Sequence, residues 1–152
     1  MKGRFSINVL VLVGLLAAFD ENPTEPPEGF PHALATPACG PVDQPLVAIY
    51  LAAAPIETSQ PAVPFVQITV PGPLTELRAG QTWAITEDYS EGTAWRFYGG
   101  TNSPITANQG DVAITEVSST MIRGSVNLRF MDGTRIRGTF DAVWQPRQLF
   151  CG

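Results

Sequence analysis

Glycine and proline recur so often along this chain that they limit the length of every regular element. After residue 20, the longest stretch without either residue is 111–123, only 13 residues. Both residues interrupt regular structure, because glycine has a high conformational entropy and proline lacks an N–H donor. This spacing argues against a helical bundle, a coiled coil or a helical solenoid, and it favours short strands joined by turns.

Short β-branched and aromatic runs lie between these turn signals, as is typical of strands. They predict strands at 45–53, 62–70, 81–86, 94–99, 111–117, 120–130 and 134–144. Prolines bracket the second run, at positions 61, 64, 71 and 73, which predicts an edge strand there. We expect one all-β domain, either an antiparallel β-sandwich or a small β-barrel of about seven to eight strands.

The last two predicted strands form a hairpin whose register follows from their side chains. A three-residue loop at 131–133 pairs Phe130 with Thr134 and puts every apolar side chain of both strands on one face. Gly133 then takes the left-handed position of a type I turn with a G1 bulge. In the preceding strand Val117 is out of phase with the apolar face, which predicts a bulge near Glu116.

The opposite face of this hairpin carries four of the seven arginines that follow residue 38. These four residues, here called the arginine face, are Arg123, Arg129, Arg135 and Arg137. The predicted register sets Arg123 against Asp141, and it sets Arg129 against Arg135 as like charges. Clustered guanidinium groups suit an anionic ligand, such as a phosphate-bearing glycan or lipid headgroup. The alternative is the ordinary solvated side of a half-buried antiparallel sheet.

The two cysteines, Cys39 and Cys151, lie at the ends of the segment that we expect to fold. A catalytic thiolate needs a base, and residues 39–152 contain no histidine. A metal site needs more ligands than two distant cysteines and His32, the one histidine of the chain. We therefore expect a Cys39–Cys151 disulfide, which suits an oxidising compartment.

The first 19 residues have the pattern of an export signal. Lys2 and Arg4 precede an apolar run at 5–19, which spans about 22 Å as a helix, short of a hydrocarbon core of about 30 Å. Residues 1–19 are thus expected to be a signal peptide or signal anchor, with a transmembrane helix as the alternative. The proline-rich, acidic segment 20–38 predicts a disordered tether, which leaves 39–152 as the folded domain.

The end of the apolar run, Leu16-Ala17-Ala18, resembles the lipobox of bacterial lipoproteins. Phe19 stands where the lipidated cysteine would be, so a thioether-linked lipid cannot form at that position. The closing stretch 122–142 resembles the end of uncharacterised bacterial exported β-domains, which are often lipoproteins. This resemblance covers about the last third of the chain. It implies a periplasmic, cell-surface or secreted location and no particular activity.

Motifs that carry catalysis are absent from the sequence. It has no nucleophile elbow, no phosphate-binding glycine loop and no zinc-protease helix motif. One acidic cluster, formed by Glu87, Asp88 and Glu91, could serve a calcium site or a glycosidase, although a solvated turn explains it more simply. Four aromatic residues could form a glycan platform, but they more simply fill the core or plug a barrel end. They are Trp83, Trp95, Tyr98 and Trp144.

These patterns predict a non-enzymatic, extracytoplasmic module that uses no cofactor or metal and binds a ligand, a glycan or an envelope partner. The net charge of −5 argues against a nucleic-acid partner. A membrane would be contacted only by the N-terminal segment, if that segment is not cleaved. One alternative is a structural protein that assembles with its own copies through β-edges. Another is a lipocalin-like carrier of a small apolar molecule inside a barrel.

Overall fold

The computed structural model describes residues 30–57, 61–87, 91–99 and 103–151. Within these ranges the strands are β1 (Phe30–Cys39), β2 (Pro45–Ala52), β3 (Phe65–Pro71), β4 (Thr82–Ala84), β5 (Thr93–Phe97), β6 (Ile105–Val117), β7 (Met121–Phe130) and β8 (Arg135–Trp144). A short 3-10 helix, η1 (Leu74–Glu76), follows β3. The predicted export segment 1–19, its lipobox-like end and the first part of the predicted tether lie outside the described residues.

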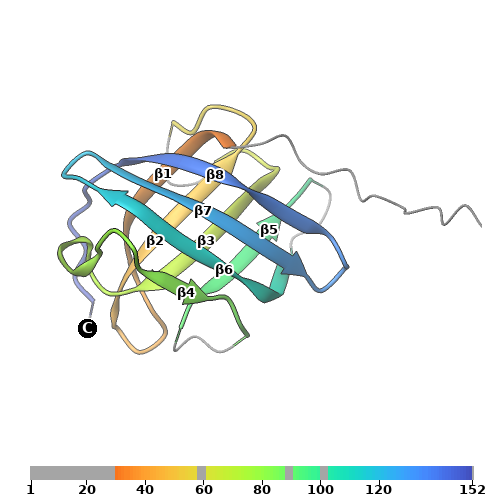
Figure 1. The fold of residues 1–152 in the computed structure, drawn as a ribbon, viewed down its shortest axis with the longest axis horizontal. Helices are drawn as coiled ribbons and strands as arrows, with labels where there is room; N and C mark the ends of the chain where they lie inside the picture. The colour runs from red at the N-terminus through yellow and green to blue at the C-terminus, as the bar shows by residue number, and fades with distance from the viewer. Residues whose placement is uncertain (1–29, 58–60, 88–90, 100–102, 152) are drawn as a thin grey trace, which may run out of the picture.

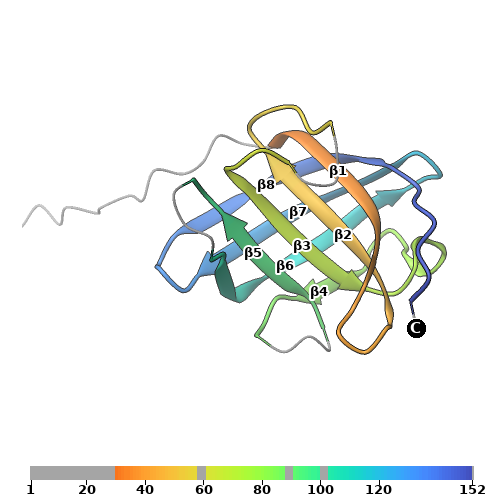
Figure 2. The same ribbon diagram turned by 180° about the vertical axis from the view of Figure 1, so that it is seen from behind.

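Seven of these strands close into a barrel. Their order is β6, β5, β3, β2, β1, β8 and β7, and β7 pairs with β6 to complete the ring. β6, β7 and β8 form one side of the barrel (Figure 1), and β1, β2, β3 and β5 form the other (Figure 2). β4 lies outside the ring and pairs with β6. Of the two predicted all-β architectures, the sandwich and the small barrel, the structure has the barrel.

One pair of strands departs from the predicted antiparallel pattern. β1 runs parallel to β8, with Ala33 opposite Ala142 and Ala35 opposite Trp144. β1 also belongs to a segment, 30–38, that we expected to be part of the disordered tether because of its prolines. Its pairing with β2 continues to Cys39, whereas its pairing with β8 ends at Ala35, before Pro37 is reached. Pro37 is compatible with β1 because the strand pairs on one side only at this position, so no hydrogen bond on the other side needs its missing N–H.

The predicted edge position of the second strand is wrong. β3 lies inside the ring, between β2 and β5. Pro61 and Pro64 precede this strand, Pro71 is its last residue and Pro73 follows it. No proline thus occupies an interior position of the strand, and both of its edges keep their hydrogen bonds.

The β7–β8 hairpin has the predicted register. Leu128 lies opposite Ile136, and Gly124 lies opposite Phe140. The N–H of Phe130 donates to the carbonyl of Thr134 at 2.8 Å, and Gly133 has φ +86°, as the three-residue loop requires. The β6–β7 register also shifts between Ile114 and Glu116, which confirms the predicted bulge.

Apolar side chains fill the inside of the barrel. The largest of those that are fully buried are Phe130, Ile49, Leu51, Ile68, Leu77, Ile85, Ile114, Ile122 and Leu128. They belong to a single cluster that spans the ring, as expected for a small barrel whose interior is just wide enough for side chains. Among the described residues, no helix is both long and apolar enough to cross a membrane.

The predicted disulfide is present. Cys39 and Cys151 are bonded, with their Cα atoms 5.6 Å apart. The bond joins the end of β1 to the segment that follows β8, and the Gln145 N–H at the start of that segment donates to the Ala35 carbonyl. The C-terminal segment is thus fixed at both ends along the free edge of β1.

Candidate functional site

The two sides of the barrel differ in charge. β1, β2 and β3 contain no Asp, Glu, Lys or Arg, and the one arginine of β5, Arg96, pairs with the inward-facing Val66. The outward positions of β6, β7 and β8 carry seven charged residues, namely Asp111, Glu116, Arg123, Arg129, Arg135, Arg137 and Asp141. The charged side chains of the strands are therefore concentrated on the β6–β7–β8 side, which faces the viewer in Figure 1.

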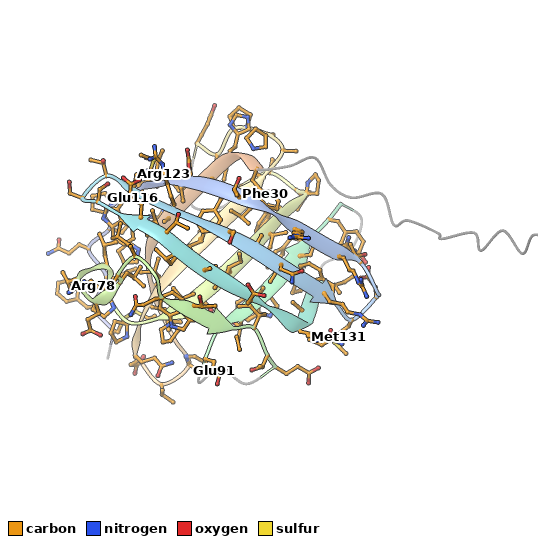
Figure 3. The ribbon with its side chains drawn as sticks, viewed as in Figure 1. Phe30, Arg78, Glu91, Glu116, Arg123 and Met131 are labelled. Atoms are coloured by element: carbon orange, nitrogen blue, oxygen red, sulfur yellow. A yellow bond between two sulfur atoms is a disulfide. The ribbon has the colours of Figure 1, made fainter. Side chains whose placement is uncertain are left out.

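The predicted arginine face divides into two unlike ends. Arg123 lies at the end of β7 that is remote from Met131 (Figure 3), where its Nη1 donates to Glu116 at 2.7 Å and its Nε lies 3.2 Å from Asp141. The hydrogen bond to Glu116 and the two carboxylates raise the pKa of Arg123. Two carboxylates thus face the single charge of Arg123, so this end of the arginine face carries a negative balance and disfavours an external anion.

The other three arginines lie toward the hairpin end, about 14–20 Å from Arg123 along the strand. Arg129 and Arg135 lie directly opposite each other, and Arg137 lies opposite Asn127. All three are exposed. Within the described part of the chain, no carboxylate lies within ion-pair distance of any of them. Two like charges directly opposite each other are unfavourable in a sheet, so an anion placed between them would relieve their repulsion.

A polar groove with a volume of about 420 Å³ lies at this hairpin end. It is lined by Gln109, Gly110, Asp111, Asn127, Leu128, Arg129 and Arg135, and we call it the arginine groove. The groove offers guanidinium and amide donors together. These groups are the ones that bind phosphate and carboxylate oxygens with the strongest hydrogen bonds.

A bulge in β6 shapes the floor of the arginine groove. The β6–β7 register shifts between Ala107 and Gln109, and Gly110 follows with φ +145°. A Cβ at Gly110 would lie 2.1 Å from the carbonyl oxygen of Asn127, so only glycine lets the two strands approach here. Bulges of this kind re-aim the neighbouring side chains. Here the neighbours are Gln109 and Asp111, which both line the groove.

Sequence reasoning found the arginines of this groove but missed its polar partners. Gln109 lies in the part of β6 that we expected to be loop. The predicted register puts Asn127 on the arginine face, but neither Asn127 nor Asp111 was predicted to bind a ligand. The available signal was Gly110, because an isolated glycine inside a strand pattern indicates a bulge or a close backbone approach. Extending the strand to Ile105 through that glycine would have placed Gln109 and Asp111 beside the arginines.

The other predicted candidates are not brought together. Trp83 and Trp144 pack against the core, Tyr98 lies under the guanidinium of Arg96, and Trp95 is on the outward row of β5. These four residues therefore form no common platform. Of the acidic cluster, Asp88 lies outside the described residues, while Glu87 and Glu91 are exposed. The described residues contain no group of three or more metal-ligating side chains.

Comparisons with protein-family models, with curated proteins and with solved structures found no match. In the arginine groove, two exposed guanidinium groups and two side-chain amides line one hollow.

Proposed function

We propose that this protein is a non-enzymatic, extracytoplasmic binding module that holds an anionic, phosphate-bearing ligand in the arginine groove. The observation that carries the proposal is the Arg129–Arg135 pair. Two exposed like charges face each other across a ladder, and no carboxylate of the described residues neutralises them. This repulsion lies within a polar groove. An anion bound between the two guanidinium groups would accept hydrogen bonds from both and remove the repulsion.

The groove suits binding better than catalysis. The guanidinium groups of Arg129 and Arg135 carry N–H donors and no acceptor, so they suit holding an anion and not taking up a proton. Asn127 and Gln109 are hydrogen-bonding groups that do not titrate. Asp111 is the one carboxylate that lines the groove, so the groove offers no pair of acids for acid–base catalysis. The set of side chains therefore holds a ligand in place and leaves it unchanged.

Assembly through β-edges is less well supported. Every strand of the seven-stranded ring has a neighbour on each side, and the part of β1 beyond Ala35 lies beside the C-terminal segment. The strand outside the ring, β4, has only three residues. Edge association needs a longer row of unpaired N–H and C=O groups. The Cys39–Cys151 disulfide is consistent with an oxidising, extracytoplasmic location, because such bonds are rare in the cytosol.

The proposal is tested by titrating isotope-labelled protein with pyrophosphate while its amide signals are followed by NMR. We expect saturable shifts at Gln109, Asn127 and Arg135. Arg135→Gln should weaken binding roughly ten- to a hundredfold, because a hydrogen bond to a charged group is worth about 1.5–3 kcal/mol. Unchanged affinity in this variant would contradict the proposal.

The matched control is Arg147→Gln, which removes the same charge from another exposed arginine that does not line the groove. Its affinity should stay within about twofold of the wild type, since distant surface charges are screened at physiological salt. Two further probes separate the sources of phosphate. A soluble sugar phosphate tests a glycan, and phosphatidylcholine vesicles with and without phosphatidylglycerol test a lipid headgroup.

A further inference from the structure

A second hollow lies at one end of the barrel and is chemically unlike the arginine groove. It has a volume of about 270 Å³ and is lined by Phe30, Pro31, Leu51, Ala52, Ala53, Pro64, Phe65, Val66, Arg96 and Ile136. Nine of these ten residues are apolar, and the tenth is an arginine. We call this hollow the end pocket. Phe30, the first described residue, lines this pocket and is labelled in Figure 3.

The cation of the end pocket comes from the inside of the barrel. Arg96 follows the fully buried Ala94 by two residues on β5 and lies opposite Val66, so its side chain starts on the inward face. Its guanidinium carbon lies 5.6 Å from the ring centre of Phe130, at the end of the core, and 5.2 Å from that of Tyr98. The two rings hold the positive charge at the boundary between the core and the pocket.

Arg96 is only partly satisfied by the protein. Its Nη2 donates to Asp132 Oδ2 at 2.5 Å, whereas its Nε is buried and has no hydrogen-bond partner among the described residues. A guanidinium group carries five N–H donors, and Asp132 engages one of them at Nη2. A buried donor without a partner is rare and costs stability, so a partner supplied by a ligand is a physical reason for it.

We propose that the end pocket binds a small amphiphilic carboxylate, with its hydrocarbon part against the apolar wall and its carboxylate on Arg96. The size fits, because an apolar cavity of about 150 Å³ is enough to hold benzene. The chemistry also fits, because a carboxylate matches the guanidinium donors, while Phe30, Phe65 and Ile136 offer only apolar contact. This site is independent of the arginine groove and differs from a carrier site inside the barrel, where side chains fill the space.

The test compares three probes by NMR titration and calorimetry, namely octanoate, 1-octanol and acetate. Octanoate should bind and shift the amides of Ala52, Val66 and Arg96. Octanol lacks the charge and acetate lacks the chain, so each should bind at least tenfold more weakly than octanoate. Equal binding of octanoate and octanol would overturn the carboxylate assignment. Absence of octanoate binding would overturn the site itself.

Two neighbouring alanines provide a matched pair of variants. Ala53 lines the end pocket, Ala54 does not, and both are exposed, so neither substitution disturbs the core. Ala53→Trp should fill the pocket and lower octanoate affinity at least tenfold, whereas Ala54→Trp should leave it within about twofold of the wild type. If octanoate bound Ala53→Trp as tightly as it binds the wild type, its site would lie elsewhere, and the proposal would be refuted.

Arg96 itself is tested with two substitutions of similar length. Arg96→Met should abolish the preference for octanoate over octanol, and Arg96→Lys should restore part of it, because lysine keeps the charge but not the fork of donors. Retained preference in a folded Arg96→Met would contradict the assignment. Arg135→Gln should bind octanoate normally, since Arg135 does not line the end pocket. Loss of pyrophosphate binding and loss of octanoate binding can thus be measured separately, so each proposed site can be refuted without the other.

Discussion

Gly124 of β7 lies directly opposite Phe140 of β8, and the Phe140 ring occupies the space that a side chain at position 124 would need. A Cβ built at Gly124 would come within 2.6 Å of that ring and within 2.3 Å of the carbonyl oxygen of Ala113. The ring could turn aside, but the backbone of β6 could not. The absence of a side chain at Gly124 thus sets how closely β6, β7 and β8 pack at this point.

Replacing Gly124 by alanine should therefore destabilise the barrel. Forcing one methyl group into a packed core costs about 1–3 kcal/mol, and the backbone contact at Ala113 places this site at the upper end of that range. Gly99→Ala is the control, because Gly99 is exposed and a Cβ there would meet its nearest neighbour at 3.9 Å. Urea denaturation of both variants measures the difference. If Gly124→Ala and Gly99→Ala had equal free energies of unfolding, β6 and β7 could move apart at position 124 at little cost in free energy.

The β7–β8 hairpin was predictable because several local signals agree. The loop length, the face of every apolar side chain and the need for a left-handed residue at Gly133 all select one register. The disulfide was predictable by exclusion, since Cys39 and Cys151 had no other chemistry available. The arginine face followed from the same register, although the ion pairs of Arg123 depend on Glu116, which comes from a third strand.

The missed elements depend on contacts between distant parts of the chain. β1 contains Pro31 and Pro37, and only its pairing with β2 and β8 makes it a strand. The end pocket joins residues from five strands, and nothing local to Arg96 indicates that its side chain faces inward beneath apolar neighbours. Neither feature has a period or a motif that a single sequence could reveal.

Removing the disulfide should cost stability without changing the fold. The bond joins residues that are 112 positions apart, and closing so long a loop is worth about 4–5 kcal/mol in the chain-entropy model. Cys39→Ser/Cys151→Ser should therefore unfold at a clearly lower urea concentration than the oxidised wild type. Wild type measured with a reducing agent is the control and should match the double variant. If reduction left the urea midpoint of the wild type unchanged, the disulfide would contribute no net stability, and the chain-entropy model would not apply to this bond.

Arg135→Glu should separate stability from anion binding. The new carboxylate would face Arg129 across the ladder and replace a repulsion by an attraction, which is worth about 0.2–1 kcal/mol in a cross-strand pair. The variant should therefore be slightly more stable than the wild type while it loses pyrophosphate binding. Arg137→Glu is the control, because its partner is the uncharged Asn127. Thermal unfolding at low salt measures both. A less stable Arg135→Glu would mean that Arg129 and Arg135 do not repel each other in the folded protein.

Asp132, which pairs with Arg96, should make the stability of the barrel depend on pH in the acid range. Partial burial alone would raise the pKa of Asp132, but the hydrogen bonds from Thr134 and the charge of Arg96 outweigh it and lower that pKa below its ordinary value of 3.8. A carboxylate with a lower pKa in the folded state stabilises that state at every pH above its unfolded pKa. This contribution is lost as the pH falls through the folded pKa.

The measurement is the free energy of unfolding of wild type and Asp132→Asn between about pH 2 and pH 7. The wild type should be the more stable of the two, by a constant amount, above about pH 5. The difference should shrink below about pH 4, because protonated aspartic acid resembles asparagine in charge. Asp43→Asn is the control, since Asp43 is an exposed loop residue for which no ion pair is found within the described residues. A difference between wild type and Asp132→Asn that persisted unchanged to pH 2 would show that the carboxylate charge contributes nothing. In that case the geometry of the β7–β8 turn alone, through the Thr134 N–H, would account for the effect of Asp132.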